Sequence, residues 1–259
     1  MQPDFHREDD DKVHELTERK RRRGIYLLPN LFTTANLFAG FYAVVAAMHG
    51  RFEAAAVAIF IAMVLDGIDG RLARLTNTQS DFGAEYDSMV DMVSFGLVPA
   101  LVMYQWALSS LGKIGWLGAF IFTAGAALRL ARFNTQLMQP DKRYFQGLPS
   151  PSAAGLIAGL VWLGVDLEVA GKSIDWLSLF VTLLAGGLMV SNVRFRSFKD
   201  LDLKDRIPFV AVFVIVLVYV FISINPPVVL FSGFAVYALS GPVLTLYELR
   251  KKKAGRGAE

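Results

Sequence analysis

Four aspartates lie within one short stretch of an otherwise apolar chain, and their spacing divides them into two pairs. Successive residues of a helix are about 100° apart, so Asp66 and Asp69 share one helical face, as do Asp87 and Asp91. Carboxylates that converge from two neighbouring helices repel each other and lose hydration, so they need cations. Ligation by carboxylate oxygens suits Mg²⁺ or Mn²⁺, and a pair of such ions clamps a transferring phosphoryl group. We therefore expect two divalent ions at this site.

Small residues and one arginine accompany the aspartates. Gly70 and Gly83 remove side chains where a ligand must approach the backbone. Arg74, one turn past Gly70, supplies a cation suited to a phosphate oxygen. Solvated or salt-bridged carboxylates at helix ends are the alternative interpretation. Four of them on facing helices, with small residues between, favour a functional site, because ionisable groups within a membrane are functional by default.

The composition places this site in a membrane protein. Of the 259 residues, 54% are hydrophobic and only 19% are charged, and the mean hydropathy is positive. This balance departs from that of ordinary soluble domains, and a helix needs roughly 20 apolar residues to cross the hydrocarbon core. Candidate spans lie at residues 30–49, 52–74, 83–107, 114–134, 151–167, 174–192, 207–224 and 226–247. We expect an all-α polytopic membrane protein with about eight transmembrane helices. The shorter runs, 151–167 especially, are also compatible with re-entrant or buried helices.

The distribution of Lys and Arg predicts the orientation. Only Arg51, Lys113 and Lys172, of the 26 basic residues, lie in the connections expected outside, and all the others lie on the opposite side. Cytoplasmic loops retain the excess of positive charge. Both termini and the connection from Thr76 to Asp81 should therefore be cytoplasmic. The aspartates, near the ends of the second and third spans, would then face the cytoplasm from the cell (inner) membrane.

Other residue types exclude several kinds of site. The chain has no cysteine, which excludes disulfides and thiolate metal sites, and its three histidines are too scattered for a histidine metal site. The first 24 residues are polar and do not read as a cleavable signal peptide.

The aspartates, glycines and Arg74 together follow the pattern D-x2-D-G-x2-A-R-x8-G-x3-D-x3-D. Its fixed positions are Asp66, Asp69, Gly70, Ala73, Arg74, Gly83, Asp87 and Asp91. This pattern resembles the signature of the CDP-alcohol phosphotransferases, and the chain matches every position. The resemblance implies an integral membrane enzyme with a six-helix core, usually a homodimer. It also implies a divalent-metal site at the cytoplasmic interface, where an alcohol attacks a CDP-linked lipid and CMP is released.

The same resemblance implies roles for single residues. The metal ligands would be Asp66, Asp69 and Asp87, with Asp91 as a shared ligand and, more importantly, the general base. The wall of the CDP site would comprise Asp69, Gly70, Ala73, Arg74 and Gly83. Asn30 and Thr33 could cap the first span, but polar groups there also resemble the family's nucleotide-side contacts.

Further segments resemble phosphatidylserine synthases of the integral-membrane type. They are "LPNLFTTANLFAGF" at 28–41, "DSMVDMVSFGLVPA" at 87–100, "RLARFN" at 129–134, "GLPSPSAAG" at 147–155 and "MVSNVRFRSFK" at 189–199. Met92 follows the last aspartate, whereas phosphatidylglycerophosphate synthases typically have lysine at this position, and this difference argues against that activity. The resemblance implies transfer of the phosphatidyl group of CDP-diacylglycerol to the hydroxyl of L-serine.

Binding of serine requires a partner for its carboxylate, and a guanidinium can match a carboxylate with two hydrogen bonds. Arg129 or Arg132, with Asn134 adjacent, is therefore a candidate for the acceptor site, although both arginines could merely snorkel at the end of the fourth span. Ser150, followed by Pro151, could simply begin a helix as its N-cap.

These expectations divide the chain into four parts. A polar and basic cytoplasmic segment covers 1–27, the six-helix catalytic core with its cytoplasmic connection covers 28–206, two additional transmembrane helices cover 207–249, and a basic cytoplasmic tail covers 250–259.

Alternative functions remain open at this point. Within the family they are archaetidylserine, phosphatidylglycerophosphate and inositol-phosphate lipid synthases; outside it they are a membrane prenyltransferase and a cation transporter.

Overall fold

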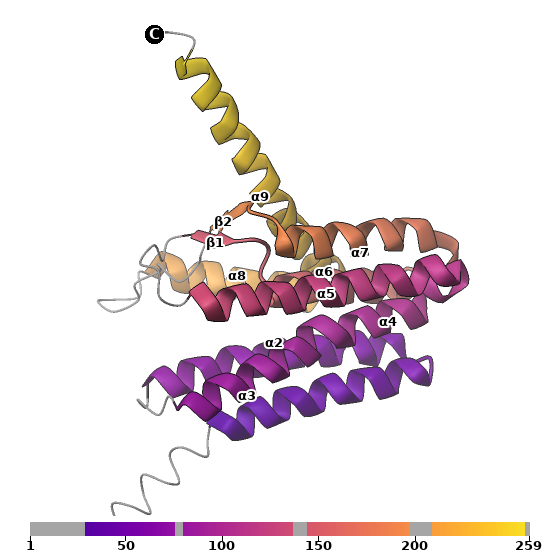
Figure 1. Ribbon diagram of the computed structural model, residues 1–259. Coiled ribbons are helices and arrows are strands. Elements are labelled where there is room, and N and C mark those ends of the chain that lie inside the picture. Colours follow the sequence, from indigo (N-terminus) through magenta and orange to yellow (C-terminus); the bar gives the residue numbers. More distant parts are fainter. Residues whose placement is uncertain (1–28, 76–79, 137–143, 197–208, 257–259) are drawn as a thin grey trace, which may run out of the picture.

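The computed structural model describes residues 29–75, 80–136, 144–196 and 209–256 (Figure 1). Helices make up nearly all of this part of the chain, which confirms the all-α membrane fold. The helices are the first helix (Pro29–Met48), α2 (Phe52–Leu75), α3 (Asp81–Asp91), α4 (Val98–Trp106), α5 (Lys113–Gln136), α6 (Ser150–Asp166), α7 (Asp175–Val190), α8 (Phe209–Ile224) and α9 (Pro226–Arg256). The predicted segment 1–27 and most of the connection between α2 and α3 lie outside the described residues.

Five helical stretches are long and apolar enough to cross a membrane on their own. Among the described residues these are Pro29–Met48, Asp81–Trp106, Lys113–Thr135, Gly171–Val190 and Pro226–Thr245. The remaining predicted spans are also helices, but α2 contains Asp66 and Asp69, and α6 and α8 have only 17 and 16 residues. Each predicted span therefore corresponds to one helix or, for the third, to a run of consecutive helical turns. Helix α9 continues past the predicted end of its span and extends beyond the bundle (Figure 1).

Helix α6 is the central element of the bundle, and it packs against α2, α4, α7 and α9. An unbroken run from Ala153 to Val161 is buried. Close packing with α9 depends on glycines, because a Cβ on Gly155 would lie 2.7 Å from the Phe234 ring and one on Gly159 would lie 2.9 Å from the Phe231 Cα. A helix surrounded by protein needs no long lipid-facing surface, which explains why its apolar run is short.

The third span is interrupted directly after its aspartates. Helix α3 ends at Asp91, a π-helical segment η1 covers Met92–Leu97, and α4 then continues the span. Pro99 has no N–H with which to bond the carbonyl four residues earlier, so regular α-helical bonding cannot continue there. Val98 instead donates its N–H to the carbonyl of Val93, five residues earlier. Such π-turns inside helices occur frequently at functional sites.

A two-stranded antiparallel sheet, which the sequence analysis did not predict, pairs the segment before α6 with the segment after α7. Strand β1 (Tyr144–Gln146) precedes α6, strand β2 (Arg194–Arg196) follows α7, and they pair antiparallel with Phe145 opposite Phe195. Phe195 is fully buried, and its ring packs 5.7 Å from that of Tyr237 on α9. The ladder therefore links the entry to α6, the exit of α7 and one face of α9.

Gly147 makes the turn from this ladder into α6. Its φ of +81° lies in the left-handed region, and a Cβ there would collide with the Met189 carbonyl. Its N–H donates to the Val193 carbonyl at 2.9 Å, and the N–H of Leu148 donates to the Leu188 carbonyl at 2.9 Å. These bonds fix the N-terminus of α6 against the end of α7.

Candidate active site

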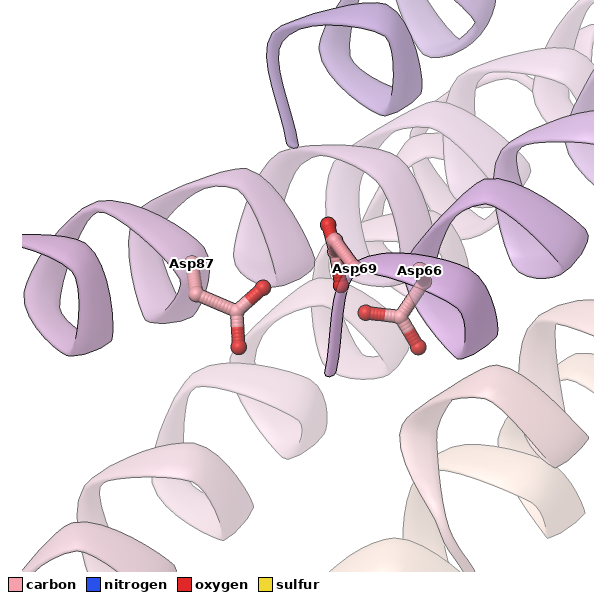
Figure 2. Close-up of side chains that lie close together, drawn as sticks. All are labelled: Asp66, Asp69 and Asp87. Carbon is pink, nitrogen blue, oxygen red and sulfur yellow. The ribbon is translucent and has the colours of Figure 1, made fainter. Parts of the chain in front are cut away.

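Three of the four aspartates converge between α2 and α3. Each of Asp66, Asp69 and Asp87 offers a carboxylate oxygen, and these oxygens all lie within 4.8 Å of one another. Figure 2 shows Asp66 and Asp87 extended toward each other from the two helices, with Asp69 between them. Asp69 is only 3% exposed. Three carboxylates this close repel one another, and Asp66 and Asp87 are partly buried beside the buried Asp69, so the donor set fits a hard divalent cation such as Mg²⁺ or Mn²⁺.

Asp91 lies beside this group, one turn after Asp87. Its side chain forms a hydrogen bond with that of Asp66. Within the described residues, one buried oxygen of Asp91 and one of Asp87 have no hydrogen-bond partner. Asp91 is therefore within reach of the acidic group but is not one of the three aspartates whose oxygens converge.

The first helix supports the acidic group from a third side. The Thr33 hydroxyl donates to Asp69 Oδ2 at 3.0 Å, and the Thr34 hydroxyl lies 3.0 Å from the Tyr86 hydroxyl. A Cβ on Gly83 would lie 3.4 Å from Asn30 Oδ1, so Asn30 faces the start of α3. Of the two residues expected on the nucleotide side, Thr33 therefore contacts an aspartate directly, and Asn30 lies near Gly83, one turn before Asp87.

The predicted nucleotide wall is partly open. A Cβ on Gly70 would meet no atom within 4 Å, which leaves room for a ligand beside the α2 backbone. Ala73 is partly buried one turn later. The N–H of Gly83 bonds the Ser80 hydroxyl at 3.0 Å and so caps α3. The Arg74 side chain lies outside the part of the chain that the structure describes.

The three residues expected to bind serine make different contacts. Arg132 donates to the Val190 carbonyl at 3.2 Å and to Asn192 Oδ1 at 3.3 Å, and Asn134 donates to the Ser88 hydroxyl at 3.2 Å. These contacts tie the end of α5 to its neighbours. Arg129 interacts electrostatically with Asp91.

The surroundings of Arg129 include residues that the sequence analysis did not select as its partners. One guanidinium nitrogen donates to the fully buried Ser150 hydroxyl at 3.0 Å, while its buried Nε has no hydrogen-bond partner among the described residues. Helix α6 begins at Ser150, one residue earlier than expected, and its N-cap is Pro149. Ser150 therefore does not cap α6, and its hydroxyl instead accepts the hydrogen bond from Arg129. Tyr237 of α9 also interacts electrostatically with Arg129. No sequence spacing relates Tyr237 to Arg129, because α5 and α9 are distant in the chain.

The family comparison covers the helices that carry these residues. Residues 26–186 match the family model described as CDP-alcohol phosphatidyltransferase. The chain belongs to this family. The match extends from the first helix into α7 and includes all four aspartates and Arg129, but it excludes β2, α8 and α9. CDP-alcohol phosphatidyltransferases are membrane enzymes that generally use divalent metals, and the converging aspartates could hold such an ion.

Several curated relatives of this CDP-alcohol phosphatidyltransferase carry one name, CDP-diacylglycerol–serine O-phosphatidyltransferase. The Helicobacter pylori relative is 35% identical over 228 residues, which cover 88% of this chain and 94% of the relative. The Mycobacterium leprae relative is 31% identical over 210 residues, which cover 78% of this chain and 69% of the relative. The Bacillus subtilis relative is 33% identical over 173 residues, covering 66% of this chain and 91% of the relative.

Proposed function

We propose that this enzyme transfers the phosphatidyl group of CDP-diacylglycerol to the hydroxyl of L-serine and releases CMP. The observation that carries the proposal is the convergence of Asp66, Asp69 and Asp87 beside Asp91, on the helices that match the family. The choice of substrates rests on the names of relatives that align with most of the chain.

The acidic group would hold two divalent ions, Mg²⁺ or Mn²⁺, through Asp66, Asp69 and Asp87, with Asp91 as a shared ligand. Bound there, the ions supply charge neutralisation for a pyrophosphate and make its phosphorus more electrophilic. The Thr33 hydroxyl restrains Asp69 at 3.0 Å, so that this ligand has a fixed orientation.

The nucleotide would lie along α2 and the start of α3. The open space beside Gly70 leaves the backbone accessible, and Ala73 adds little bulk one turn on. Asn30 and Gly83 would border the same side, with Arg74 pairing with a phosphate oxygen. The acyl chains of the lipid remain in the bilayer, so only the headgroup has to enter the bundle.

Asp91 would act as the general base. It accepts the proton of the serine hydroxyl, whose oxygen forms a bond to the phosphorus on the diacylglycerol side. The bond from that phosphorus to the bridging oxygen breaks, and CMP leaves with the electron pair. Asp91 is adjacent to the converging carboxylates without being one of them, which suits a group that must exchange a proton with substrate.

Arg129 would bind the serine carboxylate. Its Nε is buried and has no protein partner among the described residues, and its side chain approaches Asp91 from α5. A carboxylate held there would place the serine hydroxyl near Asp91. Arg132 Nη1 and Asn134 Nδ2 already donate in contacts between helices, so a structural role suits these two residues better.

The test of this function uses purified protein with Mn²⁺ or Mg²⁺ and CDP-diacylglycerol. CMP release is measured after L-serine, glycerol 3-phosphate or an inositol phosphate is added in turn. Of the three acceptors, we expect only L-serine to cause CMP release, with formation of phosphatidylserine. Release with a phosphorylated acceptor but not with serine would overturn the substrate assignment while leaving the reaction class intact.

The proposed orientation places both termini and the active site in the cytoplasm, on the basis of the Lys and Arg distribution. Because the chain has no cysteine, single cysteines can be introduced and labelled in intact cells. Thr135→Cys, at the end of α5, should resist a membrane-impermeant maleimide, whereas Lys172→Cys, between α6 and α7, should react. The reverse pattern would contradict the orientation.

The division of the chain and its oligomeric state are further parts of the proposal. Residues 28–206 would form the catalytic core, residues 207–249 an addition that packs on it through α9, and the active enzyme would be a homodimer, as the family resemblance implies. Cross-linking in membranes followed by electrophoresis tests the dimer, and a single band at the monomer mass at every cross-linker concentration would contradict it.

A further inference from the structure

Tyr237 lies on α9, in the part of the chain that follows the residues matching the family model. It is half-buried, and it interacts electrostatically with Arg129, the residue proposed to bind the serine carboxylate. The proposed catalytic roles do not use this contact. The packing of α9 on the bundle explains how a helix outside the family match reaches Arg129.

Two contacts set the register between α9 and α6. A Cβ on Gly159 would lie 2.9 Å from the Phe231 Cα, and one on Gly155 would lie 2.7 Å from the Phe234 ring. The two helices therefore run in opposite directions where they pack, because the later residue of α9 meets the earlier residue of α6. Residues three or four apart share a helical face, so the next turn of α9, which carries Tyr237, meets the first turn of α6.

Contacts on the other side of Tyr237 agree with this level. Its ring lies 5.7 Å from that of Phe195, and a Cβ on Gly241, one turn later in α9, would collide with the same ring. Phe195 belongs to β2, which pairs with β1, the strand that precedes α6. Tyr237 is therefore held between the first turn of α6 and the ladder of β1 and β2.

The same end of α6 carries the hydrogen-bond partner of Arg129. Ser150 is the first residue of α6, and its hydroxyl accepts a bond from an Arg129 Nη at 3.0 Å. The Nε of Arg129 is buried and has no partner among the described residues, and the side chain also interacts electrostatically with Asp91. Arg129 thus extends from α5 to the first turn of α6, where α9 also packs.

We propose that Tyr237 is a positioning residue for Arg129. The phenol oxygen and the Ser150 hydroxyl hold the guanidinium from α9 and from α6, and a planar guanidinium held at two points presents its remaining N–H groups in one direction. That direction is toward the acceptor carboxylate beside Asp91. The inference rests on the proposed binding of the serine carboxylate by Arg129, and it makes β2 and α9, which lie outside the family match, part of acceptor recognition.

Tyr237→Phe tests this role, because it removes the hydroxyl and keeps the ring that packs against Phe195. We expect the KM for serine to rise by about 3- to 10-fold, the size of one net hydrogen bond. The kcat and the KM for CDP-diacylglycerol should stay within about twofold of the parent values, because the aspartates are unchanged. The melting temperature in detergent should remain that of the parent. A residue that only supported the packing of α9 would not raise the KM for one substrate alone.

A second comparison uses Arg129→Met as the background. Adding Tyr237→Phe there should change the KM for serine by less than about twofold, because the effects of residues that act through each other are not additive. Tyr42→Phe is the matched control. The Tyr42 ring also lies beside an arginine, 5.8 Å from the Arg51 guanidinium carbon, but it is more than two turns past the threonine that contacts Asp69. This variant should leave both KM values unchanged.

A KM for serine within twofold of the parent in Tyr237→Phe would overturn the proposal. So would an equal rise in both KM values, a fall in kcat or a lower melting temperature, which would make Tyr237 structural. The full effect in the Arg129→Met background would also overturn it, because Tyr237 would then act independently of Arg129. If the parent enzyme uses another acceptor, the KM is measured with that acceptor, so failure of serine as a substrate is distinguishable from failure of this proposal.

Discussion

The acidic group on α2 and α3 and the C-terminal end of α5 were both predicted from the sequence to be parts of the site, yet their side chains are arranged differently in the structure. The oxygens of Asp66, Asp69 and Asp87 converge within 4.8 Å. The polar side chains of α5 separate instead: Arg129 turns inward toward Asp91, whereas Arg132 and Asn134 bond neighbouring helices.

This difference follows from how each group is spaced. The aspartates occur at intervals of three and four residues on two helices joined by a short connection, so each pair shares a face and the two faces must meet. Arg129 and Arg132 are also three residues apart, but their long side chains can reach different partners from one face. Spacing therefore predicts convergence better for short side chains on two helices than for long ones on a single helix.

The largest expected effect comes from the metal ligands. Asp66→Asn and Asp87→Asn should weaken Mn²⁺ binding, measured by calorimetry or by electron paramagnetic resonance, and should abolish measurable CMP release at metal concentrations that saturate the parent. Bound metal supplies several kcal/mol of transition-state stabilisation, and each 1.4 kcal/mol is about a tenfold change in rate. Mn²⁺ affinity within twofold of the parent in both variants would remove these residues from the metal site.

Asp91→Asn separates the base from the metal ligands. We expect kcat to fall by about 10²- to 10⁴-fold, the usual contribution of a general base. Binding of CDP-diacylglycerol should persist, because Asp66, Asp69 and Asp87 remain in place. Equilibrium binding of a radiolabelled lipid and single-turnover CMP release measure the two quantities separately, and normal turnover would refute the assignment.

Arg129→Met tests the α5 residue that interacts with Asp91. A hydrogen bond to a charged group contributes about 1.5–3 kcal/mol, so the KM for serine should rise by about 10- to 150-fold. The KM for CDP-diacylglycerol should stay within threefold of the parent value. Arg129→Lys, which keeps the charge but loses the planar fork, should restore only part of the affinity. An unchanged KM for serine in Arg129→Met would move the carboxylate site elsewhere.

Arg132→Met and Asn134→Ala should have the smallest effects on catalysis. Each removes contacts between helices, at a cost of about 1 kcal/mol per hydrogen bond, so the melting temperature should fall slightly. Turnover and both KM values should remain within threefold of the parent. A selective rise in the KM for serine in either variant would restore the sequence-based prediction that this residue binds the acceptor.

Much of the fold was accessible from the sequence because apolar length and charge patterning are local properties. Each predicted span corresponds to helical structure, although the extent of the last helix and the π-turn after Asp91 differ from the expected pattern. The π-turn was not predicted because its bonding depends on how Pro99 interrupts a helix that is apolar on both sides of it. The short ladder of β1 and β2 was missed because three-residue strands leave no periodic signal.

The sequence by itself determined the membrane character, the family pattern and the pairing of aspartates on two helical faces, since all three follow from composition and from spacing along single helices. Only the tertiary structure decided which polar residues outside that pattern approach the site. Contacts between helices that are distant in the chain, such as Thr33 with Asp69, Arg129 with Ser150 and Tyr237 with Arg129, have no signature in local spacing. They arise because the packing of small residues sets the register between helices, and that register depends on the whole bundle.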